Sequence, residues 1–243
     1  MRSSSDETHW NIHRGWDWGP VLIPCGPWRE VRFEVYEARV SDIRVDYEVD
    51  AGLKSVKGSI STYVEGNSGK IVEVSAWTND GKSIVFKGTA DVDNDGLAKL
   101  LFHINDPQLW YPHGYGKQVL YDVRATVSNG DVELDTASRR TGFRKLKLVQ
   151  QPDEIGKSFY FRVNNIDVFC GGSDWIPADS FTPRISAERY RKWLQMMVDG
   201  YQNMIRYIAL SGLGSPMLTR AESGEVVSGK QTFSTIPAMS LVF

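Results

Sequence analysis

Alternation of apolar and polar residues is the feature that most constrains the fold, and it recurs between residues 40 and 150. Side chains of a β-strand point alternately to its two faces, so a period of two predicts strands with one buried face. The clearest runs span residues 43–49, 60–64, 72–76, 98–104 and 119–127. Asn-Gly and Asn-Asp-Gly turns, typical of tight hairpins, lie between several runs. About seven short strands over roughly 110 residues predict an antiparallel β-sandwich of immunoglobulin-like size.

The composition excludes several classes of protein. The chain has 243 residues, 41% of them hydrophobic, so it carries enough apolar surface to fold. Its 28 basic and 30 acidic side chains leave no positive excess for nucleic acid. No apolar run reaches the ~18–20 residues of a membrane span, and the polar start lacks a secretion signal. We therefore expect a cytoplasmic protein, with secretion as an open alternative if the N-terminus is truncated.

Neither end of the sequence predicts a complete structural unit. Val31, Phe33 and Val35 alternate like a strand, and four of the eight tryptophans lie within the first 28 residues. Two or three strands there cannot close a sheet, so earlier strands of the same sheet are expected outside this sequence. Residues 207–243 are rich in Ser and Gly and keep no period, so we expect a poorly ordered tail.

A different pattern begins after residue 150. Two apolar runs flank Asn164-Asn165, which predicts a hairpin, and a loop is expected over residues 171–184. Ser186 is a suitable N-cap for a helix with apolar residues at positions 190, 193, 194, 197 and 198. A buried strand is expected from Met204. The order strand, loop, helix, strand predicts the opening of a parallel α/β layer.

Three residues are candidates for binding a sugar. Asp17 lies between two tryptophans, and a sugar offers C–H faces to indole rings and hydroxyls to a carboxylate. The alternative is that the indoles are core and Asp17 caps a turn. Trp175 lies with two carboxylates after a predicted strand, where the alternative is a structural loop. Arg206 ends a predicted strand and can hold a carboxylate at two points, unless it is a surface cation.

Metal and cofactor chemistry has no support in the sequence. His9 and His13 are four residues apart, a spacing that binds a metal on a helix, but the residues between them do not favour a helix. Neither of the glycine-rich phosphate-binding motifs occurs. Cys25 and Cys170 are expected to be buried thiols. We therefore expect no metal and no cofactor.

Five motifs, taken together, resemble β-mannosidases of glycoside hydrolase family 2, of the fungal intracellular kind. They are Gly-Trp-Asp-Trp-Gly-Pro at residues 15–20, Leu-Trp-Tyr-Pro-His-Gly-Tyr-Gly at 109–116, Arg-Thr-Gly-Phe-Arg at 140–144, Trp-Ile-Pro-Ala-Asp-Ser-Phe at 175–181 and Asn-Met-Ile-Arg at 203–206. They follow one another in family order. The resemblance implies a mainly β chain with four parts. Residues 1–37 would end a jelly-roll sugar-binding domain, 38–147 form the immunoglobulin-like sandwich, 148–206 begin an incomplete (β/α)8 barrel, and 207–243 form an aberrant tail, translated from an intron or a shifted frame.

The same resemblance implies a retaining exo-hydrolase that removes terminal β-D-mannose from oligosaccharides. Asp17 and Trp175 would line the sugar site, and Arg206 would steady the nucleophile. Asp174 stands where the family usually has asparagine, so it receives no role. The family's two catalytic glutamates are absent, and no Asn-Glu dipeptide occurs. We therefore assign no catalytic residue and expect this chain alone to be inactive. The alternative is a non-catalytic β-sandwich module that binds carbohydrate or protein.

Overall fold

The structure is a computed structural model that describes residues 31, 33–66, 69–78, 83–175, 179 and 184–207, with only the backbone of residues 206 and 207. The chain divides into two compact units. One is Glu34–Cys170, and the other combines Met1–Phe33 with Gly171–Phe243.

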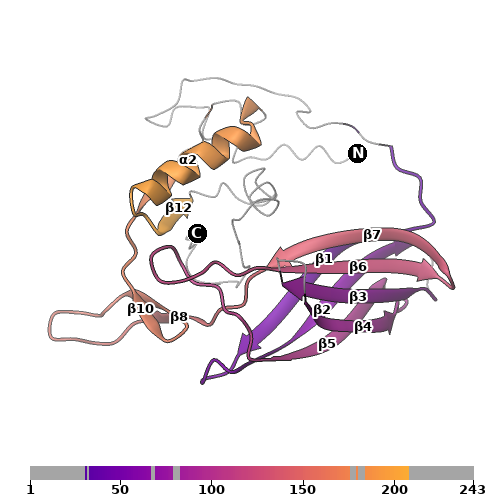
Figure 1. The fold of residues 1–243 in the computed structure, drawn as a ribbon, viewed down its shortest axis with the longest axis horizontal. Coiled ribbons are helices and arrows are strands. Elements are labelled where there is room, and N and C mark those ends of the chain that lie inside the picture. The colour runs from indigo at the N-terminus through magenta and orange to yellow at the C-terminus, as the bar shows by residue number, and fades with distance from the viewer. Residues whose placement is uncertain are drawn as a thin grey trace. The chain divides into compact units, whose positions relative to one another are not determined.

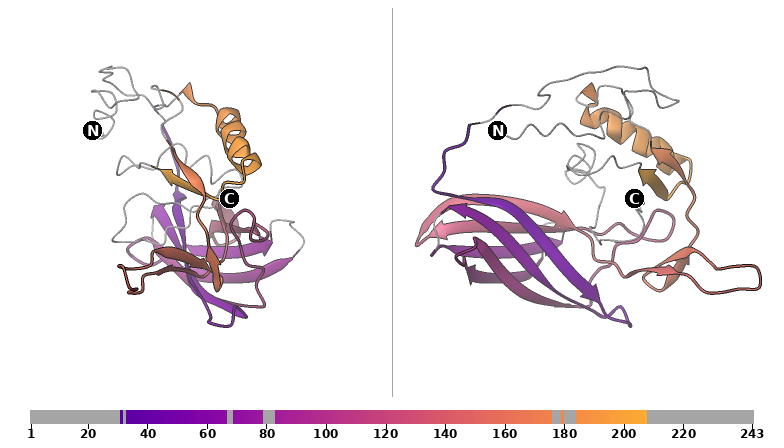
Figure 2. Two further views of the ribbon diagram at one scale, coloured as in Figure 1. Left: turned by 90° about the vertical axis from the view of Figure 1, so that its left-hand side faces the viewer. Right: turned by 180° about the vertical axis from the view of Figure 1, so that it is seen from behind.

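Two antiparallel sheets form the larger part of the Glu34–Cys170 unit (Figures 1 and 2). The three-stranded sheet has the order β1 (Ala38–Val49), β2 (Ser55–Gly66), β5 (Leu97–Asn105). The four-stranded sheet has the order β4 (Ile84–Asp91), β3 (Ile71–Thr78), β6 (Tyr121–Asn129), β7 (Val132–Thr141). The mainly β fold class and its immunoglobulin-like sandwich are therefore confirmed, and the five alternating runs coincide with β1, β2, β3, β5 and β6.

The core lies between the inner faces of these two sheets. Along β5 the residues alternate between buried and less buried positions, as the period of two predicts. Val56 of β2 meets valines of β3 and β6 in one apolar cluster, which also contains Phe102 and Phe143. Burial of this kind contributes about 25 cal/mol per Å² of apolar surface, so the cluster is the main source of the sandwich's stability.

Local turn chemistry connects neighbouring strands as the sequence predicts. Gly96 and Gly130 have φ angles of +77° and +58°, in the region that favours glycine. A Cβ on Gly96 would also lie 2.4 Å from the Val64 carbonyl oxygen. The Asp93 carboxylate accepts hydrogen bonds from the amides of Asp95 and Leu97, which closes the turn before β5.

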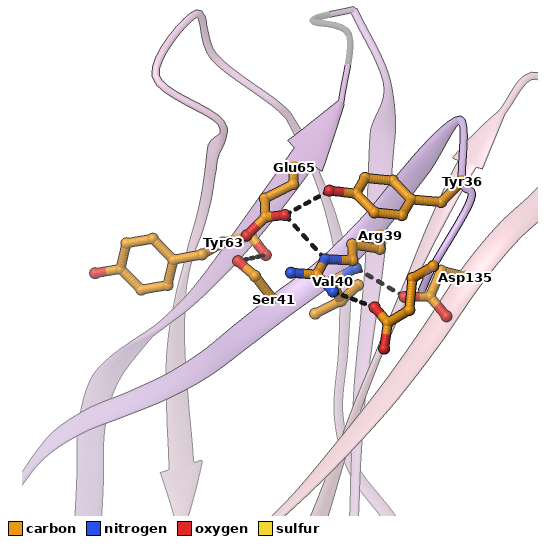
Figure 3. Close-up of polar contacts among 8 residues, drawn as sticks. Tyr36, Arg39, Val40, Ser41, Tyr63, Glu65 and Asp135 are labelled. Carbon is orange, nitrogen blue, oxygen red and sulfur yellow. Dashed lines mark hydrogen bonds and ion pairs between the residues drawn. The ribbon is translucent and has the colours of Figure 1, made fainter. Parts of the chain in front are cut away.

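The segment before β1 differs from its prediction. Residues 33–36 form no strand, and Phe33 and Val35 are 93% and 87% exposed, so the strand expected across 31–35 is wrong here. Alternation alone cannot hold a strand that has no neighbour to hydrogen-bond. Polar side chains hold the segment instead (Figure 3): Tyr36 donates to the Glu65 carboxylate at 2.7 Å, and Arg39 donates to it at 2.9 Å.

A small sheet completes this unit. It has the order β10 (Ile166–Val168), β9 (Tyr160–Val163), β8 (Leu146–Val149). Asn164 and Asn165 have φ angles of +48° and +64°, as a tight two-residue hairpin turn requires. The hairpin predicted around this Asn-Asn pair is therefore confirmed.

The described part of the other unit contains β11 (Gly172–Trp175), α2 (Ala187–Asp199) and β12 (Met204–Tyr207). β11 and β12 pair in parallel. Ser186 caps α2 by accepting a hydrogen bond from the amide of Arg189, as expected. The loop expected from residue 171 is wrong for residues 172–175, because a polar, glycine-containing sequence can still form a strand where a second backbone approaches closely. Residues 1–30 and 208–243 lie outside the described residues, so the expectations for the jelly-roll strands and the tail remain predictions.

Candidate functional site

The carboxyl ends of β11 and β12 bring two of the three candidate residues to one sheet edge. The register pairs Asp174 with Arg206 and Trp175 with Tyr207. In parallel α/β sheets, ligands bind beyond the carboxyl ends of the strands. Trp175 and Arg206, which are 31 positions apart in the sequence, therefore lie on adjacent strands at the edge where such a fold places its chemistry.

The alternation of side chains divides these residues between two faces. Residues that pair across a ladder share a face, and successive residues alternate. Asp174 and Arg206 therefore lie on one face of the strand pair. Trp175 lies on the other, together with Ile205, and both residues pack into the apolar cluster formed with α2.

Trp175 is buried by aromatic side chains of α2. Its ring is stacked on Tyr190, with centroids 5.9 Å apart and an interplanar angle of 26°, and meets Trp193 edge-on at 5.5 Å. The residue is only 5% exposed. These contacts are those of a packed core tryptophan that fixes the strand end beneath the helix. Contact between Trp175 and a sugar stays a prediction.

Asp179 follows the strand end and is bound by two arginines near the start of α2. Its carboxylate lies 3.4 Å from Nη1 of Arg189 and 3.9 Å from Nε of Arg184. Arg189 in turn lies over the Trp193 ring, with its guanidinium carbon 5.7 Å from the centroid. The second carboxylate of the predicted sugar loop is thus part of an ion-pair cluster that anchors the loop to the helix.

Two residues that are not among the three candidates position the strand pair. The Asn203 side chain accepts a hydrogen bond from the Gly171 amide at 3.1 Å, and its own amide donates to the Gly171 carbonyl at 2.9 Å. A Cβ on Gly172 would lie 1.8 Å from the Met204 carbonyl oxygen. Asn203 is the first residue of the Asn-Met-Ile-Arg motif, so this motif could have identified it from the sequence. No neighbouring residue distinguishes Gly172 from a glycine in a loop.

Asp17 lies outside the described residues, as does the part of the loop at residues 176–178, so its place in the site stays a prediction. No three His, Cys, Asp or Glu side chains gather within the described ranges in a way that could hold a metal ion. Over the same ranges, no helix has the length and apolar character needed to cross a lipid bilayer.

Comparison with known proteins gives a consistent set of relatives. Residues 38–144 match the family model described as Glycosyl hydrolases family 2. Beta-mannosidase B of Thermothelomyces thermophilus is 48% identical over 197 residues, and that of Aspergillus fumigatus is 45% identical over 195. Each alignment covers 80% of this chain and 23% of the relative.

The solved structures agree with the sequences. The crystal structure of a β-D-mannosidase from Dictyoglomus thermophilum matches with a TM-score of 0.72 and 35% identity, over 81% of this chain and 24% of that one. The chain thus spans about a quarter of the length of the proteins that it matches. Residues 38–144 are therefore similar to glycosyl hydrolase family 2, and the chain is similar to β-mannosidases, as the five motifs indicate.

Proposed function

We propose that this chain carries part of the sugar site of a retaining exo-β-mannosidase, an enzyme that removes terminal β-D-mannose residues from oligosaccharides. The observation that carries the proposal is the parallel register that sets Arg206 beside Asp174 at the carboxyl ends of β11 and β12. The similarity to proteins named β-mannosidase supports the choice of sugar. The barrel that would surround these strands is part of the proposal.

Each candidate residue has a role that its chemistry allows. The Arg206 guanidinium can hold a carboxylate at two points and so keep a nucleophile ionised and oriented. Asp17 can accept hydrogen bonds from sugar hydroxyls, since an ionised carboxylate has only acceptor sites. Trp175 holds the end of β11 against α2 and is proposed to border the sugar pocket.

The reaction itself needs groups that this sequence does not supply. Retaining hydrolysis uses two carboxyl groups about 5–5.5 Å apart, one as nucleophile and one as acid and base. In the family that this chain resembles, both are glutamates, and the acid/base follows an asparagine. Because the sequence contains no Asn-Glu dipeptide, we propose that the chain alone binds a mannoside without cleaving it.

Two measurements on the purified chain test this. Incubation with an aryl β-mannoside should give no turnover above buffer. Titration with a β-linked manno-oligosaccharide should show saturable binding that Arg206→Gln and Asp17→Ala each weaken at least tenfold. Arg191→Gln, an exposed arginine of α2, is the matched control and should bind normally.

The outcomes separate the alternatives. Turnover that Asp17→Ala abolishes would contradict the absence of a catalytic pair. Saturable binding of other glycans, with mannosides ignored and Arg206→Gln without effect, would favour a non-catalytic binding module of the β-sandwich. Absence of any mannoside binding would overturn the proposed sugar site.

A further inference from the structure

Two cationic side chains are buried among the described residues, and they differ in how their charge is balanced. Lys70 is 4% exposed, and its Nζ lies 2.5 Å from the Glu37 carboxylate. Arg144 is 5% exposed, yet within the described chain no carboxylate pairs with it, and its buried Nη1 has no hydrogen-bond acceptor. A buried charge without a counter-charge is strongly destabilising, so Arg144 needs an explanation that Lys70 does not.

A second donor without an acceptor lies in contact with Arg144. The guanidinium carbon lies 4.8 Å from the centroid of the Trp110 ring, and Trp110 is fully buried. The indole Nε1 of Trp110 also has no hydrogen-bond partner among the described residues. Buried N–H groups in folded proteins are nearly always paired. The Arg144–Trp110 pair therefore contains two buried N–H donors that have no acceptor among the described residues.

Hydrogen bonds fix the backbone at Trp110, and Gly142 packs against its ring. Its amide donates to the Phe143 carbonyl at 2.9 Å, and its carbonyl accepts from the Asn164 side chain at 2.9 Å. Gly142 packs against the ring so closely that a Cβ there would lie 3.1 Å from both Cγ and Cδ1 of Trp110. The backbone at Trp110 is therefore fixed, and Gly142 closes one side of its ring.

Arg144 is held in the same way. Its amide donates to the Tyr47 hydroxyl at 3.3 Å, and the next amide, of Lys145, donates to the side-chain amide oxygen of Asn164 at 2.8 Å. Burial lowers the pKa of the Arg144 guanidinium. The direction is that of a cation removed from water without an anion to replace the solvent. The backbone at Arg144 is thus fixed by hydrogen bonds, its guanidinium lies against the Trp110 ring, and its charge has no counter-charge among the described residues.

We propose that Arg144 and Trp110 form a binding site for a carboxylate group. The planar guanidinium presents N–H donors in a fork that matches carboxylate oxygens, and the indole N–H adds a neutral donor. A water molecule could accept from either N–H but would leave the charge unbalanced, whereas a carboxylate does both. The carboxylate can come from a small dissolved acid or from an acidic side chain, and the two sources respond differently to experiment.

The first arm tests a dissolved carboxylate. The thermal unfolding midpoint of the full chain is measured at pH 7 against sodium acetate, with sodium chloride at equal ionic strength as reference. The wild type should gain about 5 °C more in acetate, in a saturable way. Arg144→Met should lose that gain, and Lys70→Met, which alters the buried cation that already has a carboxylate, should keep it.

The second arm tests an acidic side chain. In chloride buffer without added carboxylates, the difference in midpoint between wild type and Arg144→Met is followed as the pH is lowered. A partner carboxylate within the protein makes this difference shrink as the partner becomes protonated. Trp110→Phe keeps an aromatic ring beside Arg144 but removes the indole N–H together with the five-membered ring, so it should reduce the acetate effect or the pH effect, whichever the wild type shows. It also tests the site if Arg144→Met does not fold.

A dependence of the midpoint on acetate or on pH that is lost in Arg144→Met and reduced in Trp110→Phe supports the site. Which of the two is observed identifies the source of the carboxylate. If acetate shifts the wild type and both variants equally, or not at all, and the pH profiles of wild type and variants are parallel, the proposal is overturned.

Discussion

The sandwich and the β11–α2–β12 unit complete their sheets in different ways. In the sandwich, the antiparallel pairs β1–β2, β3–β4 and β6–β7 join consecutive strands, and two inner faces bury each other. β11 and β12 are parallel, so their pairing spans a helix and depends on close backbone contact between residues 172 and 204. The sandwich therefore rests on many local signals, whereas the parallel pair rests on a few non-local contacts, and the two should respond differently to mutation.

The largest expected effect is in the sandwich core. Phe143 is buried and its ring lies 4.7 Å from that of Tyr121 and 5.0 Å from that of Tyr47. Phe143→Ala should lower the free energy of unfolding by about 3–5 kcal/mol, because it removes apolar area and leaves a cavity. Urea denaturation followed by circular dichroism measures this. Phe169→Ala, at a site that is 83% exposed, is the control and should change it by less than about 0.5 kcal/mol. Equal losses in both variants would contradict the central place of Phe143.

A smaller loss is expected where the small sheet meets the sandwich. The buried Asn164 side chain donates to the Trp110 carbonyl and accepts from the Lys145 amide. Asn164→Gly keeps the positive φ but removes both hydrogen bonds, so unfolding should become easier by about 2–3 kcal/mol. Asn165→Gly, at the next turn position, loses one exposed hydrogen bond, to the Ala51 carbonyl, and should be nearly neutral in the same urea assay. A neutral Asn164→Gly would show that these bonds do not hold the junction.

A substitution in the parallel pair should separate β11 from β12 without unfolding the sandwich. Gly172→Ala places a methyl group against the Met204 carbonyl, so β11 and β12 must separate. A local cost of about 2 kcal/mol corresponds to roughly 30-fold faster amide exchange in β12. Hydrogen exchange read by mass spectrometry measures this, with exchange in β3 and β6 expected to be unchanged. Gly156→Ala, where a Cβ meets no atom within 4 Å, is the control. Equally faster exchange in the sandwich strands would show that the two regions unfold together.

The same contrast explains how much could be predicted from sequence. The five alternating runs and the Asn164-Asn165 hairpin were predicted correctly, because their signals lie within a few residues. Within the sandwich, the strands that no run identified are β4 and β7, which are the two edges of the four-stranded sheet. An edge strand is paired on one side only and carries more polar residues, which weakens its alternation.

The candidate site was less predictable because its geometry depends on pairing between distant residues. Trp175 and Arg206 were identified by type and motif, but the register that sets Asp174 opposite Arg206 could not be known before the strands were paired. Gly172 lies in a segment with the composition of a loop. Glycine is required there because the Met204 carbonyl, thirty-two positions away in the sequence, approaches closely. The unpaired donors of Arg144 and Trp110 were likewise invisible, since burial and missing partners are properties of the folded chain.

The smallest effect concerns pH and the paired cation of the sandwich. The hydrogen bond and the positive charge of Lys70 lower the pKa of Glu37 below its ordinary value of 4.5. A carboxyl group with a lowered pKa in the folded state contributes stability that is present above its unfolded pKa and is lost as pH falls through the folded value. The wild type should therefore lose stability below about pH 4.5 more steeply than Glu37→Gln, which cannot titrate.

Unfolding midpoints measured between pH 7 and pH 3 test this, with Glu73→Gln as control because the Glu73–Lys87 pair is exposed on both sides and should contribute little. Parallel profiles for wild type and Glu37→Gln would contradict the role of the Lys70 pair. Suppose that the unfolding midpoint falls more steeply with pH in the wild type and in Glu73→Gln than in Glu37→Gln. This result would show that the Lys70–Glu37 pair contributes to stability because its cation is buried. That result would sharpen the contrast with Arg144, whose charge has the same burial and no carboxylate among the described residues.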